Sequence, residues 1–150
     1  MKVLLRSLLA VSVLAFAMPA LSQFRKPEDA AKYRQSVMFL QGQHAGRINA
    51  QLKSDSPNIQ VIVENIAVLD MTNKLFFAGF TPGSDMVPNT RAKPEIWTNL
   101  PKFKEYADKL NVDVARLSAA AKAGDLAATR SAFGTVAKTC DSCHEDFRIK

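Results

Sequence analysis

Two cysteines and a histidine stand together near the end of this chain, in the run Cys140-Asp141-Ser142-Cys143-His144. The spacing C-x-x-C-H is the attachment signature of haem c. Two thiols three residues apart can reach the two vinyl groups along one haem edge and form thioethers. The next residue then presents its imidazole to the iron, and histidine is a common axial ligand of haem iron. The run therefore predicts one covalent haem c per chain.

Three other uses of this run agree less well with the sequence. A structural zinc site takes about four protein ligands, but the chain has two cysteines and two histidines, and His44 is far away. A thioredoxin-like C-x-x-C motif follows a strand in a βαβ unit, and no such pattern precedes this run. A disulfide between Cys140 and Cys143 would suit an oxidising compartment, but it leaves His144 unexplained.

Residues 1–22 have the pattern of a secretory signal. Lys2 and Arg6 give a positive start, residues 4–17 are nearly all apolar, and small residues precede the expected cleavage after Ser22. A membrane anchor is less favoured, because the apolar run is shorter than the ~20 residues of a spanning helix. We expect the mature domain, residues 23–150, to lie in the periplasm without membrane insertion, since attachment of haem to C-x-x-C-H resembles a process that bacteria complete outside the cytoplasm.

The composition of the mature chain fits one globular domain. Its length is that of a single domain with a substantial core. The full chain has a formal net charge of +6, which falls to +4 when Lys2 and Arg6 are removed. The remaining basic residues are scattered and accompany no nucleic-acid motif, so we read them as solvated helix faces and expect no nucleic-acid binding.

The first half of the mature sequence predicts two helices. One begins at Pro27, where proline and the following acidic residues suit a first turn, and extends to about Leu52. After a loop over 54–58, the second runs from about Asn58 to Phe77. A β-branched run at 61–63 could indicate a strand, but the periodic segment is too long for one. Its apolar residues recur at helical spacing: Ile59, Ile62, Ile66 and Leu69.

The second half predicts a long loop over 79–93 and two more helices. One starts at Pro94 or Pro101 and ends near Lys122; Pro101 would make the first turn a separate piece. Its apolar line is Trp97, Leu100, Phe103, Ala107, Leu110, Val114, Leu117 and Ala121. The other is capped by Asp125 and runs to about Phe147. Its line is Leu126, Phe133, Ala137, Cys140, His144 and Phe147.

Cys140 and His144 share one face of the last helix, because they are four residues apart. The apolar line directs that face towards the protein interior, so the haem should lie against the inside of the fold. The predicted fold class is all-α, an antiparallel, up-down-up-down four-helix bundle. Such bundles build cofactor sites from facing helices.

A four-helix bundle with C-x-x-C-H on its last helix resembles cytochrome c′. Further segments resemble that family across nearly all of the mature chain: residues 26–30 and 32–36 of the first helix, 93–97 at the entry to the third, 117–121, 124–126 and 132–134 in the closing region, and C-D-S-C-H-E-D-F-R at 140–148. The motif alone indicates only haem c, whereas its terminal position with these flanking segments is specific.

The resemblance implies thioethers at Cys140 and Cys143 and a proximal axial ligand at His144. It also implies a basic side chain, Arg148, near the proximal face of the haem.

Four further contacts follow from the resemblance. Arg34 matches the first-helix arginine that lies near a haem propionate, and Gln35 lies beside it. Thr90 and Arg91 fall in the loop segment that usually passes the haem edge.

Met38 matches the first-helix position that faces the distal side of the iron, and it shares a face with Arg34. In cytochromes c′ an apolar or aromatic side chain there covers the iron without binding it, and the five-coordinate iron binds gases such as nitric oxide. In low-spin relatives a methionine there is the sixth ligand, which raises the potential and suits electron transfer. Ordinary core packing is the third interpretation.

Five other side chains are candidates for the distal side of the haem. Phe39, Phe76, Phe77 and Phe80 could add distal bulk, although ordinary core packing is the stronger interpretation for them. His44 is expected to be a surface or interface residue, because it points away from the Met38 face.

The sequence thus predicts a periplasmic c-type cytochrome that transfers electrons, binds nitric oxide at a five-coordinate iron, or does both. The alternative is a low-spin electron carrier with His144/Met38 ligation. We expect no enzymatic activity, since no distal histidine or arginine stands ready for O–O cleavage. The expected partners are periplasmic redox proteins, small gases and a second copy of the chain, the last because relatives commonly dimerise through their first two helices.

Overall fold

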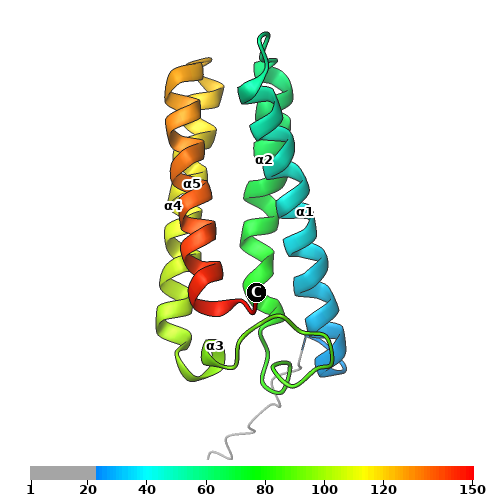
Figure 1. Ribbon diagram of the computed structural model, residues 1–150. Helices are drawn as coiled ribbons and strands as arrows, with labels where there is room; N and C mark the ends of the chain where they lie inside the picture. Colours follow the sequence, from blue (N-terminus) through cyan, green and yellow to red (C-terminus); the bar gives the residue numbers. More distant parts are fainter. Residues whose placement is uncertain (1–22) are drawn as a thin grey trace, which may run out of the picture.

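The computed structural model describes residues 23–150, so the signal-sequence prediction for residues 1–22 lies outside the described residues. Four long helices run antiparallel, up-down-up-down, and confirm the predicted fold class (Figure 1). A 3₁₀ helix and a single helical turn separate the second long helix from the third. The elements are α1 (Pro27–Lys53), α2 (Ile59–Leu75), η1 (Phe76–Gly79), α3 (Glu95–Thr98), α4 (Leu100–Lys122) and α5 (Leu126–Phe147).

Side-chain caps explain where three of the helices begin. Asn58 accepts hydrogen bonds from the backbone N–H groups of Gln60 and Val61 at the start of α2. Asp125 accepts from Ala128 N–H, which confirms its predicted role as the N-cap of α5. Asn99 caps α4, with Pro101 in the first turn, so α3 is a separate piece as the proline predicted.

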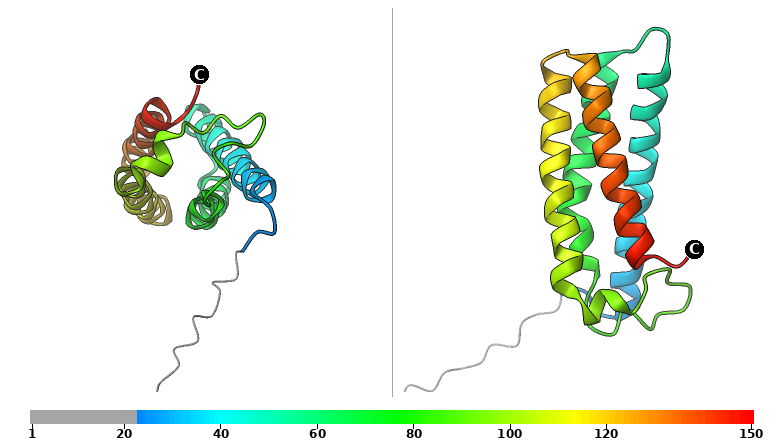
Figure 2. Two further views of the ribbon diagram at one scale, coloured as in Figure 1. Left: turned by 90° about the horizontal axis from the view of Figure 1, so that it is seen from below. Right: turned by 60° about the vertical axis from the view of Figure 1, so that its left-hand side comes forward.

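The bundle consists of two helix pairs, α1 with α2 and α4 with α5, joined mainly by α2 against α4. Figure 2 shows these two pairs along the bundle axis. α1 and α5 make the sparsest contact among these neighbouring helices. The helix that carries the C-x-x-C-H run, α5, therefore has few contacts with α1.

Two apolar clusters fill the bundle. The upper core lies towards the α1–α2 turn and comprises Ile48, Leu52, Ile62, Ile66, Leu69, Val114, Leu117, Ala121 and Val136. The lower core lies towards the C-terminus and comprises Val37, Phe76, Ile96, Phe103, Ala107 and Phe147. Edge-to-face pairs such as Phe80–Phe103, with ring centroids 4.6 Å apart, extend the lower core.

The predicted apolar lines of the last two long helices need correction. Trp97 belongs to α3 and Leu100 is 40% exposed, so the buried line of α4 begins at Phe103. On α5 the fully buried positions are Thr129, Val136, Thr139 and Phe147. The rest of the predicted α5 line, including Cys140 and His144, is half-buried. α5 buries one edge against α4, whereas the edge facing α1 stays partly uncovered.

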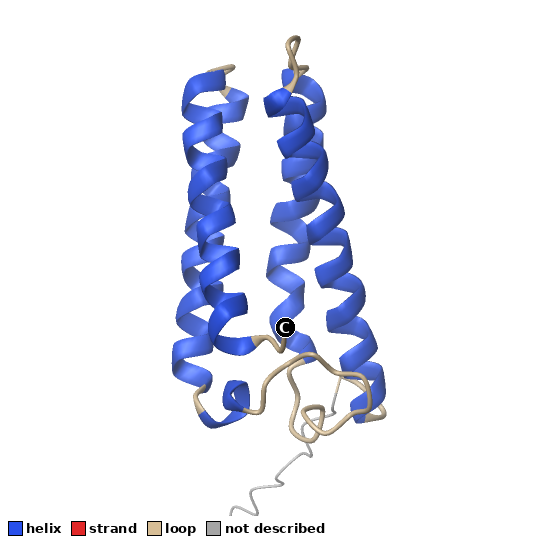
Figure 3. Ribbon diagram, viewed as in Figure 1, coloured by secondary structure: helices blue, strands red, loops and turns tan. Residues whose placement is uncertain are grey.

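The long connection over 80–94 lies at the same end of the bundle as the C-terminus (Figure 3). It lacks regular helix, as predicted, and an antiparallel bridge joins Ala92 to Arg148 just after α5. Within residues 23–150, no helix is long and apolar enough to cross a bilayer.

Candidate functional site

Cys140 and Cys143 are half-buried free thiols on successive parts of the last two turns of α5. Cys140 packs against the upper core and Cys143 against the lower core. Burial raises the pKa of Cys140 to about 11 and that of Cys143 to about 12, and the nearby carboxylate of Asp141 adds to the shift at Cys140. Both groups are therefore neutral thiols near neutral pH, placed where the two cores meet.

His144 is half-buried one residue further along the same helix. Burial lowers its pKa, and the positive charges of Arg148 and Arg91 lower it further, while Asp141 opposes them. These effects favour the neutral imidazole, which keeps a lone pair for a metal. The geometry thus brings Arg91 and Arg148, both predicted site residues, close enough to affect this ring.

Arg34 is 3% exposed and makes four hydrogen bonds to η1 and the loop that follows. Its Nη1 donates to Gly79 O at 2.8 Å and Ser84 Oγ at 2.7 Å. Its Nη2 donates to Ser84 O at 2.7 Å and Thr90 Oγ1 at 2.8 Å. Arg34 and Thr90, which the sequence assigned to one site, are therefore in direct contact, and the role of Arg34 beside a propionate stays a prediction.

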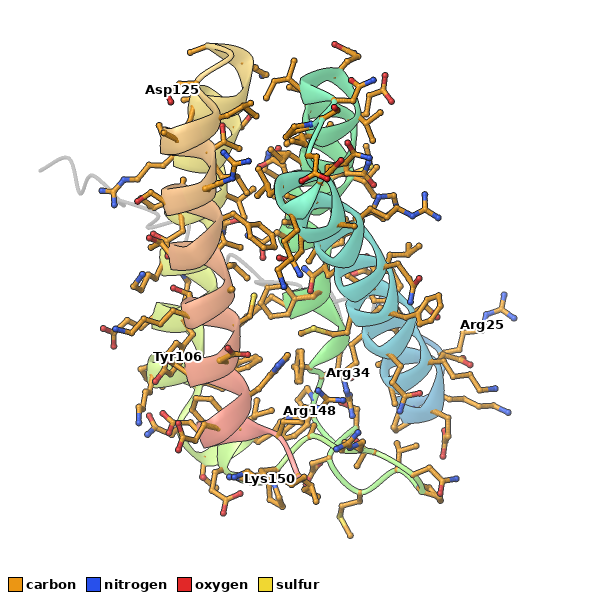
Figure 4. All side chains as sticks on the ribbon, turned by 45° about the horizontal axis from the view of Figure 1, so that its top comes forward. Arg25, Arg34, Tyr106, Asp125, Arg148 and Lys150 are labelled. Atoms are coloured by element: carbon orange, nitrogen blue, oxygen red, sulfur yellow. The ribbon has the colours of Figure 1, made fainter. Side chains whose placement is uncertain are left out.

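Aromatic rings enclose the same guanidinium group. Its Cζ lies 5.0 Å from the ring centroid of Phe80 and 5.4 Å from that of Trp97. Burial lowers the pKa of Arg34, and Asp85 opposes this effect. Figure 4 shows Arg34 on α1 and Arg148 after α5 at the same end of the bundle.

Gly79 and Ser84 are part of this arrangement although the sequence analysis did not select them. A Cβ on Gly79 would lie 2.6 Å from Arg34 Cβ and 3.0 Å from Ala30 O, so only glycine fits between η1 and α1. Ser84 is fully buried and also donates to Thr81 O at 2.7 Å. The turn-forming segment Thr81-Pro82-Gly83 predicted a loop, but nothing in it indicated which side chain turns inwards.

The end of the loop and the end of α5 are joined by two backbone hydrogen bonds and one from a side chain. Ile149 N–H donates to Arg91 O at 2.8 Å, and Arg91 Nε donates to Ile149 O at 3.1 Å. Lys93 N–H donates to Phe147 O at 3.0 Å. The predicted loop residues Thr90 and Arg91 are thereby held next to the turn that carries His144.

Met38 and Gln35 lie in different surroundings. Met38 is half-buried and packs against the lower core, the same cluster that Cys143 contacts from α5. Gln35 is exposed and lines a shallow depression on the outside of α1 with Lys32 and Phe39. Met38 and Cys143 thus contact the same cluster, whereas Gln35 lies apart from the other candidate residues.

The side chains considered for the distal side lie in three different surroundings. Phe39 is 64% exposed, so neither distal bulk nor ordinary core packing describes it and both interpretations are wrong. Phe76 belongs to the lower core, and Phe77 and Phe80 pack against it. His44, expected at the surface or an interface, is half-buried, and its Nδ1 lies 2.8 Å from Asn65 Oδ1 across the α1–α2 contact. This bond holds His44 within its own helix pair.

A buried polar network lies on the other side of Cys140, between α4 and α5. The Asp113 carboxylate, on a residue 3% exposed, accepts from Lys109 Nζ at 2.6 Å and from Thr139 Oγ1 at 2.7 Å. Burial alone would raise the pKa of Asp113, but these bonds outweigh it and lower the pKa. The network fixes α5 against α4 at the residue before Cys140.

The residues present fit a covalently attached haem. Two neutral thiols and one neutral imidazole stand close together on the last two turns of α5, and all three are only half-buried. Thiols form thioethers and a neutral imidazole can bind iron, so this donor set matches the chemistry that haem c needs. Among residues 23–150, no cluster of three or more His, Cys, Asp and Glu side chains offers a bare metal site instead.

Residues 29–148 match the family described as Cytochrome C'. Cytochrome c' of Rubrivivax gelatinosus is 40% identical over 129 residues, which cover 85% of this chain and all of the relative. Cytochrome c' of Alcaligenes xylosoxydans xylosoxydans is 41% identical, with 85% of this chain and 99% of the relative covered. A cytochrome c-556 of Agrobacterium tumefaciens is 30% identical, with 78% and 94% covered.

Solved structures of cytochrome c' have a fold similar to that of this chain. The crystal structure of cytochrome c' from Rubrivivax gelatinosus has a TM-score of 0.79 at 40% identity and covers 84% of this chain and 99% of its own. The nitric oxide complex of a variant cytochrome c prime from Alcaligenes xylosoxidans also has a TM-score of 0.79 at 40% identity, with 85% and 99% covered.

Proposed function

Because this chain belongs to the cytochrome c′ family and carries one covalent haem c through Cys140 and Cys143, we propose that it binds nitric oxide at a five-coordinate iron and exchanges electrons with redox proteins. His144 is the single protein ligand of the iron in this proposal. The observation that carries it is the match to a 40% identical relative solved as a nitric oxide complex. In this chain Met38 from α1 and Cys143 from α5 contact the same apolar lower core. This packing supports Met38 as the side chain that covers the distal side of the cofactor.

His144, the lower core and Arg34 have separate roles in this proposal. When bound, the haem supplies an iron that alternates between ferric and ferrous states and accepts a small gas as a ligand. The half-buried environment of His144 keeps the imidazole neutral and able to bind the iron. The aromatic side chains of the lower core exclude water from the side on which Met38 lies. Arg34 holds the loop that closes this end of the bundle.

Nitric oxide as the ligand is supported by the solved complexes of the Alcaligenes xylosoxidans relative, which is 40% identical to this chain. A distal side lined by apolar side chains suits a neutral diatomic gas better than an anion, because it offers no charged group to pair with. The proposal therefore rests on Met38 acting as a cover and not as a ligand.

Stopped-flow mixing of ferrous protein with nitric oxide tests this role. Met38→Leu keeps the bulk and removes the sulfur, whereas Met38→Ala removes both. If Met38 only covers the iron, Met38→Leu binds nitric oxide at nearly the wild-type rate and Met38→Ala binds it at least several-fold faster. A large acceleration in Met38→Leu would show that the sulfur had occupied the sixth position, and it would refute the five-coordinate proposal.

The second candidate is a low-spin electron carrier with His144/Met38 ligation. It is favoured by the half-buried thioether of Met38 next to the cluster that also contacts Cys143. Methionine is an established sixth ligand in cytochromes c, where it raises the reduction potential. Electron exchange is common to both candidates, so the ligation state alone separates them.

We do not propose an enzymatic activity. A peroxidase needs a free basic or cationic group on the distal side to assist O–O cleavage. The arginine and the histidine of α1 that are not exposed are both engaged in hydrogen bonds: Arg34 with Gly79, Ser84 and Thr90, and His44 with Asn65.

Export to the periplasm and a homodimer complete the proposal. Export is supported by the signal pattern of residues 1–22, after which the family match begins at residue 29. The dimer is supported by exposed apolar side chains on the first two helices, where water contact is unfavourable. These exposed side chains are Phe39 and Leu40 on α1 and Met71 and Leu75 on α2. A second copy of the chain would cover them.

A further inference from the structure

The last turn of α5 carries His144 and ends in four backbone carbonyls that the helix itself leaves without partners. The first of these, His144 O, accepts from Arg148 N–H at 3.0 Å. The remaining three belong to Glu145, Asp146 and Phe147. Helix ends fray when such groups have no partner, and here fraying would move the imidazole.

Lys93 satisfies all three of these carbonyls. Its Nζ donates to Glu145 O at 2.9 Å and to Asp146 O at 3.0 Å. Its backbone N–H donates to Phe147 O at 3.0 Å. One residue, 52 positions before Glu145, therefore closes the end of the helix. Its positive charge also lies at the negative end of the helix dipole.

Lys93 is itself held firmly. Its carbonyl accepts from Ile96 N–H at 3.1 Å, and Ile96 is a buried residue of the lower core. The preceding residue, Ala92, forms the antiparallel bridge with Arg148. The ammonium group thus reaches α5 from a backbone that is fixed on both sides, so the contact restrains the helix end.

We propose that Lys93 is a positioning residue for the axial imidazole: by clamping the three terminal carbonyls of α5, it fixes the turn that carries His144 and so sets the strength of the iron–histidine bond. This inference rests on the proposed assignment of His144 as the axial ligand. Lys93 touches neither the iron nor a gas ligand in this account and acts through the helix end alone.

Lys93→Met tests the clamp, because it removes the ammonium group and keeps the length and the backbone bond. Lys102→Met is the matched control. Lys102 contacts the same turn, but through the Asp146 side chain, with Nζ 2.8 Å from Oδ2. The control removes the same charge from the same turn and leaves the carbonyl bonds intact, so the difference between the variants isolates the clamp.

Two measurements on the haem-loaded protein give the readout. Hydrogen exchange of the Arg148 amide, which bonds to His144 O, should be about tenfold to thirtyfold faster in Lys93→Met, because two hydrogen bonds of the helix end are lost. Lys102→Met should change it less than about threefold. The iron–histidine stretching band of the ferrous protein in resonance Raman spectra should broaden and shift to lower frequency in Lys93→Met only, and Lys93→Arg should restore most of it.

The proposal would be overturned if Lys93→Met showed the wild-type exchange rate of the Arg148 amide and an unchanged iron–histidine band. It would also be overturned if Lys102→Met had equal effects, because charge alone would then explain them. If Lys93→Met does not yield folded protein, Lys93→Gln, which also loses the ammonium group, is held to the same two outcomes. Absence of an iron–histidine band from the ferrous wild type would instead refute the proposed five-coordinate iron, because a six-coordinate low-spin haem does not show this band. The exchange measurement would still decide whether Lys93 clamps the helix.

Discussion

Arg34→Met removes the guanidinium group that connects α1 to the loop over 80–94 and keeps a side chain of similar reach. Four hydrogen bonds are lost, to Gly79 O, Ser84 Oγ, Ser84 O and Thr90 Oγ1. Arg34 and Ser84 are buried, so water cannot readily replace the hydrogen bonds that Arg34 made. We expect a protein that folds but has a loosened loop.

The size of the effect follows from these contacts. A hydrogen bond from a charged donor contributes about 1.5 kcal/mol or more, so four bonds contribute about 6 kcal/mol. The cost of burying the guanidinium group, seen in its lowered pKa, offsets part of this sum. We expect a loss of about 3–4 kcal/mol in the free energy of unfolding, or about 10–15 °C in melting temperature for a domain of this length.

Urea unfolding of the haem-loaded protein, followed by circular dichroism, measures this loss. Arg47→Met is the control, because Arg47 is exposed on the same helix and its removal should change the stability by less than about 0.5 kcal/mol. Amide exchange should rise in the loop, above all at Ser84, whose N–H bonds to Thr81 O. A difference below 1 kcal/mol between the two variants would refute the view that Arg34 organises the loop.

Gly79→Ala should destabilise the fold by about 2 kcal/mol or more in thermal unfolding, because its Cβ would clash with Arg34 Cβ; Gly42→Ala, in open space, is the control. Asp113→Asn should cost about 1–2 kcal/mol at pH 7. Although burial opposes them, the hydrogen bonds from Lys109 and Thr139 hold the pKa of Asp113 in the folded protein below the ordinary value of 3.8. The wild-type advantage should therefore be complete above that value and fade as pH falls through the folded pKa, which urea titrations at several pH values can check. Phe39→Glu should shift the dimer to monomer in analytical ultracentrifugation; an unchanged mass would exclude this face.

Local signals in the sequence predicted the helices well. Asp125 was expected to cap α5 and Pro101 to separate a first turn from α4, and both expectations are confirmed. Each depends on a few neighbouring atoms: an aspartate side chain over a helix start, or a proline ring that cannot continue a helix. Such effects do not need the rest of the fold.

Burial was predicted less well where it depends on how helices are arranged. The α5 line through Cys140 and His144 was expected to point inwards, but full burial falls on the neighbouring Thr129, Val136 and Thr139. A regular apolar spacing indicates one face of a helix, yet it does not say which neighbour covers that face. The sparse contact of α1 with α5 is a property of the assembled bundle.

Contacts between segments far apart in the chain could not be predicted from the sequence. Arg34 and Met38 share a helix face, yet one is bonded to the loop over 80–94 and the other packs against the lower core. Ser84 and Lys93 had no motif to mark them, because their roles arise only when the loop meets α1 and the end of α5. The C-x-x-C-H run predicted the cofactor and the resemblance to cytochrome c′ its setting, whereas these contacts appear only in the folded structure.

The ferric absorption and electron paramagnetic resonance spectra of the wild-type protein, recorded beside those of Met38→Leu, test the central claim most directly. A five-coordinate iron held by His144 predicts a high-spin signal in both proteins and no far-red band from a thioether–iron bond. A low-spin wild type with that far-red band, lost in Met38→Leu, would contradict the account and establish Met38 as the sixth ligand.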